Sequence, residues 1–109
     1  MTREFIMTIV FDRLWSKLSL TDYDLSKLED TLMTNPNIGD IIQGTGGARK
    51  TRFALHDTGK SSGVRVIYVD IPHKEQTYLL LCYSKSQKDD LSYEQKRQTK
   101  VLIEALRGA

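Results

Sequence analysis

Three segments with strand-forming composition follow one another in the second half of the chain, over residues 49–55, 64–71 and 77–84. The first has a period of two, the second is rich in β-branched and aromatic residues, and the third is apolar, all of which is typical of strands. The connections, 56–63 and 72–76, have eight and five residues. A crossover between parallel strands needs about a dozen residues or more, so these connections predict antiparallel neighbours. The segment 49–84 therefore predicts an antiparallel meander.

The first part of the chain contains one expected strand and two expected helices. Residues 4–11 are almost continuously apolar, which predicts a strand, and residues 12–18 are compatible with a short helix. Thr21 is typical of a helix N-cap, and an apolar stripe of Leu25, Leu28 and Leu32 follows it at helical spacing. These leucines are predicted to lie in the core. Pro36 disfavours helical geometry at the residue before it, so we expect this helix to end near Thr34.

The last part of the chain predicts one more helix. Ser92 and Gln95 match the capping-box pattern, and apolar residues at helical spacing continue to about Leu106. The order is strand, two helices, three strands and helix, which indicates an α+β fold. At 109 residues, we expect a single domain over 1–109, with helices on one side of the sheet.

The composition of the chain bears on its location in the cell. The longest apolar run, residues 78–83, is far shorter than the roughly 20 residues of a membrane span. The N-terminal segment has no long apolar region of the kind found in signal peptides. Cys82 is the only cysteine, so no intrachain disulfide or cysteine metal cluster is expected. These features favour a cytoplasmic protein.

Positive charge is concentrated in one stretch. Residues 44–68 contain five Lys or Arg and one acidic residue, a net charge of +4, whereas the whole chain carries +2. The period of two in a strand places Lys50 and Arg52 on one face of 49–55, and Thr51 and Phe53 on the other. Two neighbouring cations on one face indicate a solvated surface or an anionic partner. The charge pattern therefore predicts binding to a polyanion, most commonly through phosphate.

Three strings of residues resemble a known family of proteins. They are GDIIQGTGGARKTRFA at 39–54, GKSSGVRVIYV at 59–69 and TYLLLCYSKSQKDDLS at 77–92. In this order the chain resembles the RelE/ParE superfamily of bacterial toxins, and most of all its HigB-type branch, which cleaves mRNA on the ribosome. The resemblance implies a small, twisted, mainly antiparallel sheet of about four strands with two N-terminal helices and one C-terminal helix.

The same resemblance implies an activity and partners. The protein would be a ribosome-dependent endoribonuclease that cuts mRNA in the A site without a metal or another cofactor, as the toxin of a type II toxin–antitoxin pair. A HigA-like helix-turn-helix antitoxin would neutralise it and bind operator DNA, and no membrane would be involved. Such cleavage uses the ribose 2′-OH as nucleophile, and needs a base, an acid and cations that stabilise the phosphorane.

Individual residues take roles by their position in the resemblance. Lys50 and Arg52 match the positions at which RelE-like toxins have catalytic cations on a strand. Arg65 matches the family's second-strand arginine and is assigned to the scissile phosphate. Lys85 matches a position after the last strand where the family has basic residues. Further residues are expected to contact RNA without taking part in the chemistry: Arg49, Lys60, Tyr68, Tyr83 and Lys88.

The chain also departs from the family pattern. Ser86 stands where some RelE toxins have a catalytic arginine, and Tyr83, Tyr93 and His56 are only near the positions of known bases. The general base stays open, as do codon preference, antitoxin identity and oligomeric state. Two other functions remain: a ParE-like inhibitor of DNA gyrase, and a homologue that binds RNA or an antitoxin without cutting. An ion pair of Arg65 with Asp57 or Asp70 is a purely structural alternative.

Overall fold

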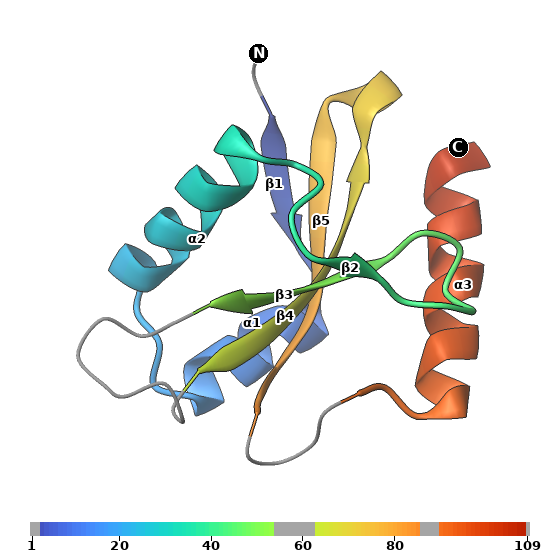
Figure 1. Ribbon diagram of the computed structural model, residues 1–109. Helices are drawn as coiled ribbons and strands as arrows, with labels where there is room; N and C mark the ends of the chain where they lie inside the picture. Colours follow the sequence, from blue (N-terminus) through green and yellow to red (C-terminus); the bar gives the residue numbers. More distant parts are fainter. Residues whose placement is uncertain (1–2, 54–62, 86–89, 109) are drawn as a thin grey trace.

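A computed structural model describes residues 3–53, 63–85 and 90–108 of the chain. It shows an α+β fold, as the element order predicts, with helices on both faces of one sheet (Figure 1). The sheet has five strands in the order β1-β5-β4-β3-β2. The elements of the sheet are β1 (Glu4–Met7), β2 (Asp40–Ile41), β3 (Arg49–Phe53), β4 (Val64–Ile71) and β5 (Gln76–Ser84).

The predicted meander is confirmed. Strand β4 pairs antiparallel with β3 on one side and with β5 on the other. A short 3-10 turn, η2 (Pro72–Lys74), joins β4 to β5, and Glu75 closes it in the left-handed region at φ 53°. The apolar strands β4 and β5 form the centre of the sheet, since both of their faces are covered.

The sheet is mainly antiparallel, as expected, but it has five strands rather than about four, and one of its edge pairs is parallel. Strand β1 pairs parallel with β5. The helices α1 and α2 and the strands β2, β3 and β4 lie between them in the sequence, which provides the long connection that parallel strands need. Strand β2 is a fifth strand of only two residues that the sequence does not predict, and it pairs with β3. A strand of two residues is too short to be predicted from a run of strand-forming residues.

Helix α1 (Ile9–Lys17) begins earlier than predicted, and β1 ends at Met7 rather than at residue 11. The reason lies at Thr8, whose hydroxyl accepts a hydrogen bond from the backbone N–H of Phe11 and so caps the helix. Phe11 is then a buried helical residue that stacks on Trp15, with ring centroids 5.3 Å apart. The apolar run at residues 4–11 is therefore a strand only as far as Met7, and it continues as the first turn of α1.

Helix α2 (Asp22–Thr34) has the boundaries that the sequence predicts. Thr21 and Asp24 form a complete capping box, and the helix ends just before Asn35. Leu28 and Leu32 are each 1% exposed, as expected for the apolar stripe. The predicted core role of this stripe is confirmed.

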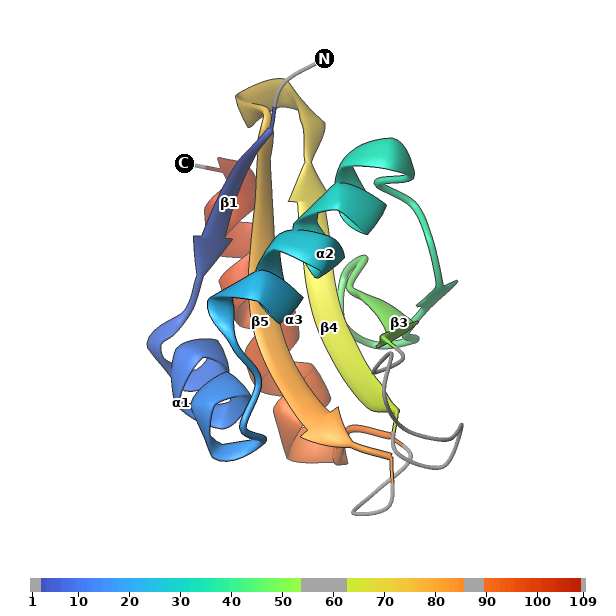
Figure 2. The ribbon, with the colours of Figure 1, turned by 90° about the vertical axis from the view of Figure 1, so that its left-hand side faces the viewer.

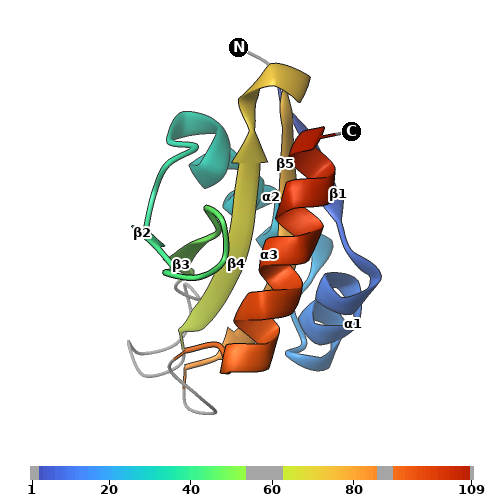
Figure 3. The same cartoon turned by 90° about the vertical axis from the view of Figure 1, so that its right-hand side faces the viewer.

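Helix α3 (Tyr93–Gly108) begins with the predicted capping box, in which Ser92 and Gln95 exchange hydrogen bonds of 2.9 and 3.1 Å. It lies against the opposite face of the sheet from α1 and α2 (Figures 2 and 3). The expectation that the helices share one side is therefore wrong. Both faces of β4 are buried, so an apolar layer is required on each side of the sheet. The sequence of each helix does not say which of the two layers it covers.

The sheet separates two apolar cores. One lies under α1 and α2 and includes Phe11, Trp15, Leu28 and Tyr68. The other lies under α3 and includes Ile67, Val69, Leu80 and Ile103. Over the described residues, no helix is long and apolar enough to cross a membrane.

Candidate functional site

The central feature of the candidate site is a pair of arginines on neighbouring strands. In the antiparallel register of β3 and β4, Arg52 is directly opposite Arg65. Directly opposite residues point to the same face and have Cβ atoms about 5 Å apart, and like charges in this position are destabilising. Arg52 is exposed and Arg65 is partly buried. The fold thus places two arginine side chains at directly opposite positions on one face, where their like charges repel each other.

Lys50 extends this pair along β3. It lies two residues before Arg52, on the same face, since Thr51 and Phe53 turn into the core under α1 and α2. The predicted alternation of β3 is confirmed by burial, because Thr51 is 6% exposed. We call Lys50, Arg52 and Arg65 the cationic face. Arg52 and Arg65, which are 13 residues apart in the sequence, meet there through strand pairing.

The alternative that Arg65 forms a structural ion pair with Asp70 is contradicted. The carboxylate of Asp70 forms a 3.0 Å ion pair with the guanidinium of Arg3 and accepts a 2.8 Å hydrogen bond from the hydroxyl of Thr77. The Nε atom of Arg65 is buried and has no hydrogen-bond partner among the described residues. A buried donor without a partner costs free energy, and an anionic ligand is one group that relieves this cost. Asp57, the other candidate, lies outside the described residues.

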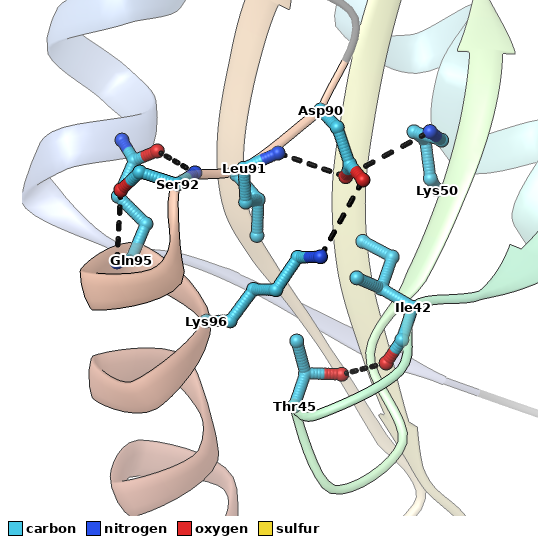
Figure 4. A network of polar contacts seen from close by, with 8 residues as sticks. All are labelled: Ile42, Thr45, Lys50, Asp90, Leu91, Ser92, Gln95 and Lys96. Carbon is cyan, nitrogen blue, oxygen red and sulfur yellow. Dashed lines mark hydrogen bonds and ion pairs between the residues drawn. The ribbon is translucent and has the colours of Figure 1, made fainter.

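A network of charges adjoins the cationic face (Figure 4). The carboxylate of Asp90, just before α3, lies between the ammonium groups of Lys50 at 3.9 Å and Lys96 at 3.5 Å. The backbone N–H of Leu91 donates a 2.8 Å hydrogen bond to the same carboxylate. Partial burial opposes ionisation, but this hydrogen bond and the two lysines together lower the pKa of Asp90.

These residues line a hollow of about 290 Å³ between β2, β3 and the start of α3. The side chains that contribute polar groups are Asp40, Gln43, Lys50, Asp90 and Lys96. Neither Asp90 nor Lys96 was among the predicted site residues. No local pattern marks them, because they reach Lys50 only when α3 packs against the sheet.

Three of the predicted RNA contacts are placed differently. Arg49 lies on the other face of β3, where its guanidinium donates a 2.9 Å hydrogen bond to the carbonyl of Gly39. Tyr68 is 0% exposed, and its hydroxyl donates to the carbonyls of Pro36 and Ile38. Burial raises the pKa of Tyr68 to about 12, with Asp70 adding to this and Arg49 opposing it. Tyr68 cannot stack on a base from this position, so its assignment as an RNA contact is wrong.

Tyr83 is also buried, with 6% of its surface exposed. It occupies the position directly opposite Arg65 on β5, so its ring lies on the same side of the sheet as the two arginines. So little exposed surface leaves no ring face on which a base could stack, and the expectation that Tyr83 contacts RNA is wrong. Its place beside Arg65 instead makes it part of the wall of the candidate site.

The remaining predicted residues divide into two groups. Lys85 follows the end of β5, where its backbone N–H donates to the carbonyl of Gly63, and it is partly buried close to the Arg65 end of β4. The other residues lie outside the described part of the chain: Lys60, Lys88, His56 and Ser86. Within residues 3–53, 63–85 and 90–108, no cluster of three or more His, Cys, Asp or Glu side chains could hold a metal.

Comparison with known proteins identifies the class of fold. The sequence matches no protein-family model. The structure is similar to that of the E. coli toxin RelE, solved in the free state as a variant with two arginines replaced by alanine. The two chains superpose with a TM-score of 0.55 at 15% identity, covering 94% of this chain and 98% of that one. The chain therefore has a RelE-like fold, as the sequence resemblance implied; its place in the HigB-type branch remains a prediction.

The arrangement has a definite chemical capacity. Arginine stays protonated at any physiological pH, and its planar fork matches two phosphate oxygens. Two arginines and a lysine on one face suit a phosphate that gains negative charge during a reaction. The described residues include no group placed as an evident general base, so the geometry accounts for anion binding and charge stabilisation better than for proton abstraction.

Proposed function

We propose that this protein is the toxin of a toxin–antitoxin pair and that it acts as a metal-independent endoribonuclease on mRNA in the ribosomal A site. The observation that carries the proposal is the direct opposition of Arg52 and Arg65 with Lys50 on the same face. The RelE-like fold supports it, since the structural neighbour is itself described as a toxin.

In the proposed reaction the 2′-oxygen of a ribose attacks the adjacent phosphorus, and the 5′-oxygen of the next nucleotide leaves. Arg65 binds the scissile phosphate, and Arg52 stabilises the charge that develops on its equatorial oxygens. Lys50 or Arg52 supplies a proton to the leaving oxygen. The base that takes the 2′ proton is not assigned.

The proposed partners follow from the proposed function as a toxin. A HigA-like helix-turn-helix antitoxin would neutralise the toxin and bind the operator, and the ribosome would present the mRNA. We infer a cytoplasmic site of action, because the proposed substrate is translating mRNA. Membership of the HigB-type branch, with its dependence on the ribosome, belongs to this proposal.

A ribosome-programmed cleavage assay tests the function. Purified protein is added to ribosomes that hold a defined mRNA, and new 5′ ends are mapped by primer extension. We expect cleavage in the A site by the wild type, in the presence of a metal chelator that leaves the ribosomes intact. Arg65→Ala should reduce the cleavage rate by about 100-fold or more, as for the loss of one charge-stabilising donor.

The matched control is Arg97→Ala. Arg97 carries the same charge on the surface of α3, where it pairs with Glu94 at 56% exposure. Its loss should leave cleavage within about twofold, because surface substitutions away from a site are close to neutral. Absence of new RNA ends with the wild type, or equal rates for Arg65→Ala and Arg97→Ala, would contradict the proposal. Inhibition of DNA gyrase without RNA cleavage would indicate the ParE-like alternative.

A further inference from the structure

The hollow beside the cationic face contains one carboxylate held between two ammonium groups from different elements. Lys50 comes from β3 and Lys96 from the first turns of α3, and both lie within 4 Å of the Asp90 carboxylate (Figure 4). Two lysines that converge on one small anion form an arrangement suited to a phosphate oxygen as well as to a carboxylate oxygen.

The contact with Asp90 is weak enough to be exchanged. The separations of 3.9 and 3.5 Å are longer than the roughly 2.8–3.0 Å of a direct charged hydrogen bond. The side chain of Asp90 is 49% exposed, and ion pairs in water contribute little to stability. Leu91 is 5% exposed and holds the backbone in place, so a rotation of the Asp90 side chain is enough to vacate the position. The rotation also gives up the 2.8 Å hydrogen bond from the Leu91 N–H.

The position of the hollow relative to the cationic face fits a continuous strand of RNA. Lys50 belongs to both, since it shares a face with Arg52 and reaches Asp90. Alternate residues of a strand are about 6.6 Å apart, which is of the order of the separation of neighbouring phosphates in an extended strand. A phosphate at Arg52 and Arg65 would therefore place the next one within reach of Lys50 and Lys96.

We propose that Lys50 and Lys96 form a second phosphate-binding site for single-stranded RNA, which the Asp90 carboxylate occupies until RNA displaces it. The proposal rests on the proposed function for the identity of the ligand as RNA. It assigns Lys96 as an RNA contact and Asp90 as an internal competitor.

The experiment measures binding without cleavage. The probe is a short single-stranded RNA with 2′-O-methyl groups, which removes the nucleophile, and Kd is measured by fluorescence anisotropy at several salt concentrations. Asp90→Asn keeps an oxygen that accepts from the Leu91 N–H but removes the charge. Asp40→Asn is the matched control, because Asp40 lines the same hollow from β2 but has no ion pair with either lysine in the described part of the chain.

We expect Asp90→Asn to bind the RNA about three- to tenfold more tightly than Asp40→Asn does. Lys96→Met should weaken binding and lower the slope of log K against log salt by about 0.7, the value for one phosphate contact on a single strand. Lys100→Met, one turn further along α3, should leave the slope unchanged. In the Lys96→Met background, the gain from Asp90→Asn should disappear.

Equal affinities for Asp90→Asn and Asp40→Asn would overturn the proposal, as would a gain from Asp90→Asn that persists without Lys96. These outcomes are independent of catalysis. If the protein binds the probe as described but leaves ribosomal mRNA intact, the proposed nuclease function fails while the second phosphate site stands. If the protein cuts mRNA and Asp90→Asn has no effect on binding, the second phosphate site fails while the proposed nuclease function stands.

Discussion

Arg52 on β3 and Arg65 on β4 are direct cross-strand partners, and the Nε atom of Arg65 is buried without a hydrogen-bond partner among the described residues. Two like charges in this position repel each other, and a buried unpaired donor adds to the cost. Both effects oppose the stability of the sheet at this point. The arrangement becomes favourable when an anion lies between the two side chains.

This relationship predicts a trade between stability and RNA binding. Arg52→Gln removes one of the two like charges, so the free energy of unfolding should rise by about 0.2–1 kcal/mol at low salt. The gain should shrink in high salt, where repulsion is screened. The same variant should bind 2′-O-methyl RNA more weakly. Urea unfolding at two salt concentrations checks the first part, and a loss of stability in Arg52→Gln at low salt would refute it.

Tyr68 should act on stability and not on RNA. Tyr68→Phe removes the hydroxyl that donates to the carbonyls of Pro36 and Ile38, so we expect a loss of about 1–3 kcal/mol in the free energy of unfolding. Tyr93→Phe is the control for stability, since Tyr93 is 81% exposed and should be neutral. The affinity of folded Tyr68→Phe for RNA should equal that of the wild type; a large loss of affinity would restore Tyr68 as an RNA contact.

Gly39 should be far less tolerant of substitution than Gly44. Both have positive φ, 90° and 84°, so alanine strains the backbone at either position. A Cβ at Gly39 would also lie 2.3 Å from the backbone oxygen of Lys50, whereas one at Gly44 would meet nothing within 4 Å. Gly44→Ala should cost about 1–2 kcal/mol and Gly39→Ala roughly 3 kcal/mol or more. Thermal unfolding of the two variants compares them, and equal losses would refute the close approach at Lys50.

The buried ion pair of Arg3 and Asp70 should tie the N-terminal strand to the sheet. Their side chains are 5% and 9% exposed, so Asp70→Asn leaves a buried guanidinium without its counter-charge and should cost about 3–5 kcal/mol. The double variant Arg3→Met with Asp70→Asn should lose less than the sum of the two single variants, because the unpaired charge is gone. Urea unfolding of the four proteins gives the coupling, and additive losses would show that the pair contributes no interaction of its own.

Alkaline pH should destabilise the fold through Cys82 and Tyr68. Burial raises the pKa of Cys82 from 9.0 to about 12, and that of Tyr68 from 10.0 to about 12. The unfolded chain therefore loses these protons at lower pH than the folded one, so stability is complete below about pH 9 and falls as pH rises towards 12.

Cys82→Ala separates the two contributions. Between about pH 9 and 10 the fall belongs mainly to the thiol, so this variant should show a flatter dependence there than the wild type. The cavity that alanine leaves lowers stability equally at each pH, and the slope is therefore the quantity to compare. Urea unfolding under reducing conditions provides it; identical slopes would mean that the thiol does not titrate as its burial requires.

Much of the fold follows from local patterns in the sequence. The N-cap at Thr21, the capping box at Ser92, the helix end before Pro36 and the antiparallel order of β3, β4 and β5 all appear in the structure as predicted. These features depend on residues that are neighbours in sequence or on connections that are too short for a crossover. The alternation that puts Lys50 and Arg52 on one face of β3 is of the same kind.

The faces of the sheet could not be predicted in this way. An apolar stripe shows that α3 packs on something, but not that it covers the face opposite α1 and α2. Tyr68 and Tyr83 were predicted as RNA contacts because the sequence does not reveal which aromatic rings a second apolar layer buries. Asp90 and Lys96 were missed for the related reason that they approach Lys50 from another element.

The sequence by itself determined the charge of the stretch around β3 and β4, the meander that contains it and the resemblance to RelE-like toxins. Only the tertiary structure decided that Arg52 faces Arg65, that Asp90 lies between Lys50 and Lys96, and that Tyr68 is in the core. The physical reason is the range of the interactions. Turns, caps and alternation act over a few residues, whereas strand register and the packing of a helix on a sheet bring together groups that are far apart along the chain.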